Sequence, residues 1–210
     1  MVFSCTFAYN FLIYFMEQSF KELVRKNRSY RRFDASKPVG EDVLTDIIDT
    51  ARMTPSGANR QTIRFRLVYT KNECERVFNT LKWAAYLSDW AGPEEQERPT
   101  AYIVLLNDKS LTKASTYDDG IIAQTITLAT VEKGLGCCIL QACKSQDLLL
   151  LLGIDSEKYE FSSVIAIGTP VETVVLEDIR NGDVRYYRDE DQIHHVPKRT
   201  LDELILRLIR

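Results

Sequence analysis

Apolar residues in the sequence follow two different periods, and each period predicts one kind of secondary structure. Between Glu41 and Met53 they recur at steps of three and four residues, which predicts an amphipathic helix. The same spacing predicts helices over residues 20–26, 74–85 and 145–152, and a terminal helix that starts at Leu201. Pro and Gly stand next to several of these segments, as expected at helix ends.

Residues 63–70 instead alternate apolar and polar side chains, which is the period of a strand with one buried face. Apolar runs at residues 101–106, 137–140 and 163–168 are typical of buried strands. Residues 118–133 are long enough for a helix and carry few charges in the middle, so we expect a helix buried on several faces. Helices and strands therefore interleave, which favours an α/β or an α+β fold.

Length and composition are those of a globular protein. The chain has 210 residues, of which 45% are hydrophobic and 27% charged, and we assign residues 16–210 to a single domain. Residues 1–15 are apolar, contain no Lys or Arg and are too short to span a bilayer. We expect them to be a disordered or over-extended N-terminal segment, with Met16 as a natural start. No membrane partner is expected.

Cysteine and histidine spacing does not predict a metal site. The five cysteines match no paired metal-ligand or dithiol motif, which favours reduced thiols in a cytoplasmic protein. The adjacent pair Cys137 and Cys138 leaves a redox role open. His194 and His195 are also adjacent, and we expect a surface pair, because two ligands alone rarely hold a metal.

The charge is slightly acidic overall but strongly basic in one segment. Lys and Arg total 27 against 30 Asp and Glu, a net charge of −3, which argues against a nucleic-acid partner. Residues 21–37, in contrast, hold seven basic and two acidic residues. Within them, Arg28, Ser29 and Arg31 offer the forked donors and the hydroxyl that suit a phosphate. A solvated basic surface fits the same pattern equally well.

A second polar cluster, residues 55–61, lies between a predicted helix and a predicted strand. The amides of Asn59 and Gln61 each provide a donor and an acceptor, which suits the mixed edge of a heteroaromatic ring. Taken alone, the segment is an ordinary turn.

The two clusters together, with two later motifs, resemble the signatures of the nitroreductase family of flavin mononucleotide (FMN) enzymes. Residues 28–33 (Arg-Ser-Tyr-Arg-Arg-Phe) resemble its N-terminal signature, and residues 51–61, which run through Pro-Ser to Asn and Gln, resemble the second. Residues 134–139 are similar to its glycine-bounded segment, and residues 197–199 (Pro-Lys-Arg) to its basic C-terminal motif. The resemblance implies an α+β nitroreductase-like fold, with a central, mostly antiparallel sheet flanked by helices, in an intertwined homodimer.

The resemblance also implies roles for individual residues. Arg28, Ser29 and Arg31 would hold the FMN phosphate and ribityl chain, and Lys198 and Arg199 would reach the same phosphate. Many relatives have Arg at the position of Asn27, so one phosphate donor of the family is absent here.

The remaining implied contacts surround the flavin ring. Pro55, Ser56 and Asn59 would reach it from the other subunit, and Gln61 would lie near the ring or the ribityl chain. The backbone around Leu140 and Gln141 would face the reactive flavin nitrogen, although many relatives have Gly or an acidic residue at the position of Gln141.

The implied activity is a ping-pong oxidoreduction, in which FMN carries the chemistry and no side chain acts as a nucleophile. NADH or NADPH would reduce the flavin and leave, and a nitroaromatic, a quinone or a similar small acceptor would then be reduced. Three alternatives stay open. One is a reductive dehalogenase-like enzyme with residues 83–99 as a lid, and another is a flavin-binding redox sensor or carrier without fast turnover. The third is a plain phosphate- or nucleotide-binding module, which predicts a colourless protein.

Overall fold

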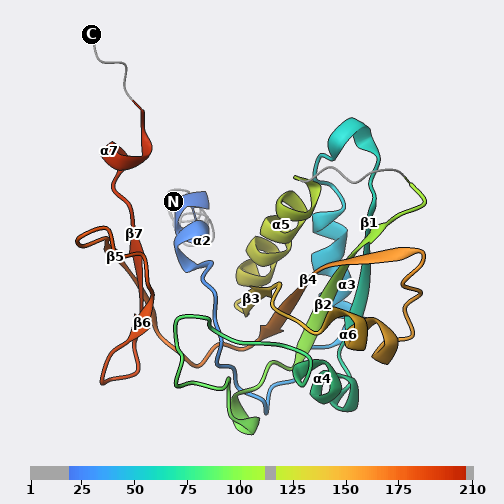
Figure 1. Ribbon diagram of the computed structural model, residues 1–210, viewed down its shortest axis with the longest axis horizontal. Helices are drawn as coiled ribbons and strands as arrows, with labels where there is room; N and C mark the ends of the chain where they lie inside the picture. Colours follow the sequence, from blue (N-terminus) through green and yellow to red (C-terminus); the bar gives the residue numbers. More distant parts are fainter. Residues whose placement is uncertain (1–18, 112–116, 207–210) are drawn as a thin grey trace, which may run out of the picture.

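The computed structural model describes residues 19–111 and 117–206, and its helices and strands alternate along the chain (Figure 1). The helices are α2 (Phe20–Lys26), α3 (Glu41–Ala51), α4 (Lys71–Phe78), α5 (Asp118–Glu132), α6 (Ser145–Leu151) and α7 (Leu201–Leu204). The strands are β1 (Ile63–Val68), β2 (Ala101–Asp108), β3 (Gly136–Leu140), β4 (Tyr159–Gly168), β5 (Val174–Asp178), β6 (Tyr187–Arg188) and β7 (His194–Lys198). Short 3-10 turns form η1 (Gly57–Asn59) and η2 (Glu95–Glu97). Among these described helices, none is long and apolar enough to cross a bilayer.

The main sheet has four strands in the order β1, β2, β4, β3. All three neighbouring pairs are antiparallel, and the β2–β4 register shifts between Leu105 and Leu106. Every residue of the central strand β2 is buried, as its continuous apolar run predicts. The predicted α+β architecture with an antiparallel sheet is confirmed.

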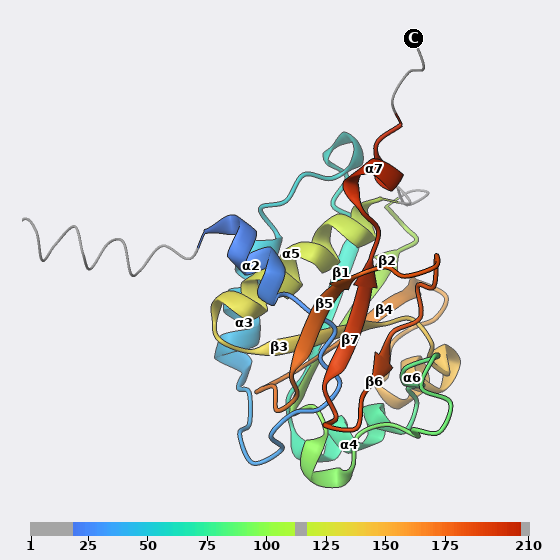
Figure 2. The same ribbon diagram turned by 90° about the vertical axis from the view of Figure 1, so that its left-hand side faces the viewer.

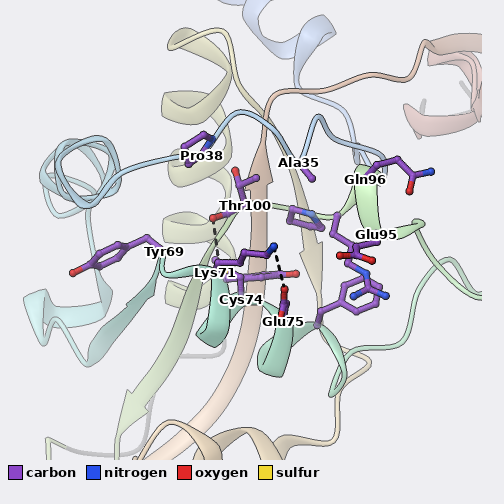
Figure 3. A pocket seen from close by; sticks show the side chains of 13 residues that line it. Ala35, Pro38, Tyr69, Lys71, Cys74, Glu75, Glu95, Gln96 and Thr100 are labelled. Atoms are coloured by element: carbon purple, nitrogen blue, oxygen red, sulfur yellow. Dashed lines mark hydrogen bonds and ion pairs between the residues drawn. The ribbon is translucent and has the colours of Figure 1, made fainter.

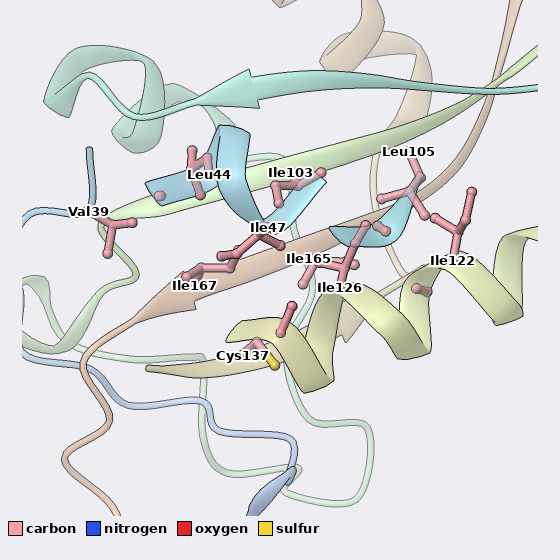
Figure 4. Close-up of a cluster of buried hydrophobic side chains, with 14 of the residues drawn as sticks. Val39, Leu44, Ile47, Ile103, Leu105, Ile122, Ile126, Cys137, Ile165 and Ile167 are labelled. Carbon is pink, nitrogen blue, oxygen red and sulfur yellow. The ribbon is translucent and has the colours of Figure 1, made fainter. Parts of the chain in front are cut away.

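Helices cover both faces of this sheet. On one face, α3 and α5 pack on β2 and β4 through apolar side chains, including Leu44, Ile47 and Ile126 (Figure 4). On the other face, α4 and α6 pack on the alternate residues of the same strands, with Trp83 in this second cluster. Helix α5 buries eight residues around its circumference, in agreement with the prediction for residues 118–133.

A small second sheet follows the main one in sequence. Strand β5 pairs in parallel with β7, and β6 pairs antiparallel with β7 on the other side. Figure 1 shows this sheet apart from the main sheet, with α2 between it and α5, and Figure 2 shows it from the front. The sequence did not predict these strands, because they are only two to five residues long and rich in polar residues.

Two predicted helices have different bounds in the structure. The helix predicted over 74–85 begins at Lys71, because the hydroxyl of Thr70 caps it by accepting from the Glu73 N–H. It ends at Phe78, and the following backbone pairs elsewhere: Lys82 N donates to the Ala142 carbonyl at 2.8 Å. The terminal helix is a single turn, α7, within the described residues. The predicted N-terminal segment, residues 1–15, lies outside them.

Candidate functional site

A cavity of about 300 Å³ opens between the segment that follows α2, helix α5, the edge strand β3 and strand β7. Four parts of the chain that are distant in sequence contribute to it, and it contains four of the predicted phosphate ligands. The lining residues are Asn27, Arg28, Ser29, Arg31, Gln124, Thr127, Cys137, Ile139, Tyr186, His194, Val196 and Lys198. The fold therefore brings the basic segment and the C-terminal basic motif to one site.

The basic segment lies against the edge of the main sheet. Ser29 forms an isolated parallel bridge with Cys137, and the N–H of Tyr30 donates to the Cys137 carbonyl at 2.9 Å. This close approach requires a glycine, because a Cβ at Gly136 would lie 2.8 Å from Cδ2 of Tyr30. The strand edge thus positions the side chains on both sides of Tyr30.

A buried carboxylate, Glu172, holds the same segment from the opposite side. Its side chain is fully buried and accepts hydrogen bonds from the backbone N–H groups of Arg31 and Arg32. It also accepts from Nη2 of Arg188 at 2.9 Å, and the Arg188 guanidinium lies 4.2 Å above the Trp90 ring. Three donors compensate the buried charge, so this ion pair orients the cavity wall.

Arg31 is almost fully buried, and its guanidinium spans the cavity wall. Its Nη1 donates to the Ser29 carbonyl at 3.2 Å and lies 3.1 Å from Nε2 of His194. A guanidinium only donates, so Nε2 of His194 is the acceptor and its Nδ1 carries the proton. Burial and the charge of Arg31 lower the pKa of His194 to about 4, which keeps the imidazole neutral. Arg31 also stacks 4.6 Å from the centre of the Tyr186 ring.

Several donors in this cavity are buried without a partner. They are Nε of Arg28, Nε of Arg31 and Nδ1 of His194. Burial lowers the pKa of Arg28 from its ordinary value, because the charged form loses solvation. An oxygen-rich anion would satisfy these donors and compensate the charges. The residues present therefore fit a phosphate group.

Asn27, which stands where many nitroreductases have Arg, has a different role here. Its Nδ2 donates to Oγ1 of Thr127 at 2.8 Å, so that it links the basic segment to helix α5. The positive charge of the site comes from its neighbours.

The second motif lies outside this cavity, in the loop around η1. Its amides are occupied locally: Ser56 Oγ accepts from the N–H of Gln61 at 3.1 Å, and Gln61 Nε2 donates to Oδ1 of Asn59 at 3.2 Å. Ala58, Asn59 and Gln61 all have φ between 51° and 53°. Left-handed conformations at three non-glycine residues within four positions are strained, and strain of this kind concentrates at functional loops. Pro55 is exposed beside them.

Three further predicted residues do not line the cavity within one chain. The Leu140 side chain is buried in the second apolar cluster, and Gln141 is exposed after β3. Their neighbour Ile139 lines the cavity instead and is 41% exposed. Arg199 follows Lys198 but is exposed, and its Nη1 donates to Oε1 of Glu203 at 3.2 Å.

The family comparison matches this arrangement. The model of the nitroreductase family matches residues 24–169, which include the basic segment, the second motif and the whole main sheet. The chain belongs to the nitroreductase family. Among curated proteins, none matches it.

Solved structures share the fold of this nitroreductase-family chain. A candidate nitroreductase from Desulfovibrio desulfuricans, solved with FMN, is 22% identical, with a TM-score of 0.65 over 92% of this chain and 99% of that one. A candidate NAD(P)H:FMN oxidoreductase from Staphylococcus epidermidis is 14% identical, with a TM-score of 0.67 over 91% and 97%. An enone reductase of a gut-bacterial fatty acid saturation metabolism is 17% identical, with a TM-score of 0.63 over 80% and 95%.

The structure adds residues that the sequence motifs did not indicate. His194 was expected at the surface, but only 1% of it is exposed, and it packs 5.2 Å from the Tyr186 ring. Its neighbour His195 has the opposite environment, between Glu177 and Asp189 at 3.2 and 3.0 Å. Successive residues of β7 face opposite sides of the strand, so His194 points inward and His195 outward. Recognition of β7 as a strand would have predicted this difference. The described residues contain no group of three or more potential metal ligands.

Proposed function

We propose that this protein is an FMN-dependent oxidoreductase that passes electrons from NADH or NADPH to small acceptors such as nitroaromatics or quinones. The observation that carries the proposal is the buried basic cavity. It gathers Arg28, Ser29, Arg31 and Lys198 from both ends of the described chain and leaves guanidinium nitrogens without partners. The related fold of a chain solved with FMN supports the same cofactor.

In this proposal, the basic segment and the end of β7 hold the cofactor phosphate. Arg28 and Arg31 donate from their unpartnered Nε atoms, and the exposed hydroxyl of Ser29 fills the remaining geometry. Lys198 and Arg199 approach from the opposite wall, where Lys198 already lines the cavity. The neutral imidazole of His194 supplies a further N–H through Nδ1.

The flavin ring in turn would lie along the open end of β3. The backbone around Leu140 and Gln141 then faces the reactive part of the ring, next to the half-exposed Ile139. FMN, when bound, supplies the electron relay between the nicotinamide and the acceptor. The residues named above would hold and orient the cofactor, and NADH or NADPH and then the acceptor would react with it in turn.

A homodimer completes this site in the proposal. Pro55, Ser56, Asn59 and Gln61 are exposed or half-exposed in a strained loop, and they do not line their own cavity. A strained, exposed loop whose polar side chains bond within the loop itself suits contact with a cofactor bound to a second copy. The dimer therefore accounts for a motif that one chain leaves unused.

A reductive dehalogenase-like activity is the second candidate, because the segment proposed as a lid touches the cavity wall. Tyr86 packs 5.0 Å from Tyr186, and Trp90 lies under Arg188. This segment is thus placed to influence which acceptor is reduced. It is also anchored: Trp83 is buried in the core.

The decisive test is a visible absorption spectrum of the purified protein with FMN, followed by anaerobic NADH or NADPH and then an acceptor. We expect bound flavin that bleaches promptly and regains its colour with a quinone or a nitroaromatic. Recovery with a halogenated aromatic alone would favour the dehalogenase. Bound flavin that does not bleach would favour a carrier or sensor, and absence of FMN binding would overturn the proposal.

A further inference from the structure

A second cavity, of about 440 Å³, lies beside helix α4 and shares no lining residue with the basic cavity. Figure 3 shows Lys71, Cys74 and Glu75 entering it from α4, with Glu95 and Gln96 on the side of η2. Its volume is in the range of small-molecule sites. None of the residues proposed for FMN takes part in it.

The inner part of this cavity holds two buried donors without partners. Tyr102 has no exposed surface, and its hydroxyl makes no hydrogen bond. Arg98 also lines the cavity, and its buried Nε has no acceptor. Among the described residues Arg98 forms no ion pair, and its guanidinium stacks 4.2 Å from the centre of the Phe78 ring.

Burial keeps the Tyr102 hydroxyl and the Cys74 thiol protonated, so neither group offers Arg98 a charged acceptor. Burial raises the pKa of the Tyr102 hydroxyl well above its ordinary value, while the charge of Arg98 acts on it in the opposite direction. Burial also raises the pKa of the Cys74 thiol to about 12, and that thiol already donates to the Thr100 carbonyl at 3.3 Å. The Tyr102 hydroxyl and the Arg98 Nε therefore remain buried donors that an acceptor from outside the chain would satisfy.

The walls of the cavity are apolar, aromatic and held in place. Phe78, Tyr69 and two prolines contribute flat or rigid surfaces. The η2 wall is tied to the neighbouring segment by backbone bonds, Phe33 N to Glu97 O at 2.9 Å and Ala35 N to Gln96 O at 3.0 Å. A preformed site with these walls favours a planar apolar body.

The rim limits the charge that a ligand can carry. Glu75 and Glu95 line the cavity and are exposed, and among the described residues only Glu75 of the two forms an ion pair, with Lys71 at 3.9 Å. Two carboxylates near the opening disfavour a multiply charged anion such as a nucleotide. A single negative charge reaches Arg98 with less repulsion.

We propose that this second cavity binds a small aromatic monocarboxylate, with its carboxylate accepting from Arg98 and Tyr102 and its ring packed between Phe78 and the prolines. The inference does not depend on the proposed function, because the two cavities are separate.

Calorimetric titration of benzoate into the full-length protein with excess FMN tests this site. We expect saturable binding that leaves the visible flavin spectrum unchanged. Arg98→Gln should weaken binding by roughly tenfold or more, and Tyr102→Phe by roughly two- to tenfold, since Arg98 contributes an opposite charge in addition to a hydrogen bond. Arg180→Gln, the same change at an exposed arginine outside the cavity, should leave binding unchanged.

Four results would overturn the proposal. They are no saturable binding at millimolar benzoate, equal affinity in the folded Arg98→Gln protein, equal affinity for neutral benzamide, and a flavin spectrum that changes in step with saturation. Circular dichroism of each variant verifies folding. Because Tyr102→Phe keeps the aromatic volume, this variant still tests the site if Arg98→Gln is unstable. Failure of FMN binding in the same samples bears only on the proposed function.

Discussion

Nε2 of His194 accepts a hydrogen bond from Nη1 of Arg31 at 3.1 Å, which joins the C-terminal sheet to the basic segment. This contact requires a neutral imidazole, because an imidazolium would direct an N–H at the guanidinium. Burial and the charges of Arg31 and Arg188 all lower the pKa of His194. One interaction therefore holds both walls of the proposed phosphate site.

We predict that His194 stays neutral, as the Nδ1–H tautomer, down to about pH 4. Its folded pKa is lower than its unfolded value, so its contribution to stability is present above about pH 6.5 and is lost as the pH falls toward 4. Nitrogen-detected NMR of the histidine side chains measures both the tautomer and the midpoint. A midpoint near 6.5 would contradict the buried contact with Arg31.

The adjacent His195 should show the opposite dependence. Hydrogen bonds to Asp189 and Glu177 raise its pKa, and its ring stacks on Tyr187 at 4.8 Å. Its contribution to stability is therefore present below about pH 6.5 and is lost as the pH rises through the raised folded pKa. We expect His195→Gln to remove the decrease in the free energy of unfolding above about pH 6.5, as measured by urea unfolding at several pH values. His194→Gln should leave this decrease unchanged.

These two histidines show what the sequence could and could not predict. Periodicity identified the main sheet and its helices, because each element buries a continuous apolar face. It missed β5, β6 and β7, because these strands are only two to five residues long and rich in polar residues, and so bury no continuous apolar face. Without β7, the inward direction of His194 was not visible. The basic segment and the C-terminal basic motif were found from residue type alone. That they line one cavity depends on long-range contacts, which the sequence does not show.

Arg28→Ala and Lys198→Ala should each weaken FMN binding by about 1–3 kcal/mol, because each removes a charge-assisted contact to phosphate. Both residues line the cavity, and Nε of Arg28 has no partner in it. Fluorescence titration with FMN measures the affinity. Arg25→Ala, in the same basic segment but exposed and outside the cavity, is the matched control. If Arg28→Ala and Lys198→Ala bind FMN as tightly as Arg25→Ala and the unsubstituted protein do, Arg28 and Lys198 are not part of the site.

Glu172→Gln should destabilise the protein by about 3 kcal/mol, the range found when one partner of a buried ion pair is removed. The amide offers one acceptor oxygen in place of two, while Arg188 keeps a buried charge. Equilibrium urea unfolding measures the change, and Glu190→Gln, an exposed acid nearby, is the control. FMN affinity should fall as well, because Glu172 orients the backbone of Arg31. A stability loss no larger than that of the control would refute this role.

The adjacent thiols Cys137 and Cys138 should be unreactive in the folded protein. Both are buried, and burial raises the pKa of each, so that little thiolate forms near neutral pH. Among the four cysteines of the described residues, Cys143 alone is half-buried, and we expect iodoacetamide to modify it before the other three, as mapped by mass spectrometry. If Cys137→Ala and Cys138→Ala retain nicotinamide-dependent bleaching of the flavin, the thiols have no part in turnover. Fast modification of either thiol, with a matching change in flavin reduction, would instead favour the redox sensor, because a buried structural cysteine cannot give that result.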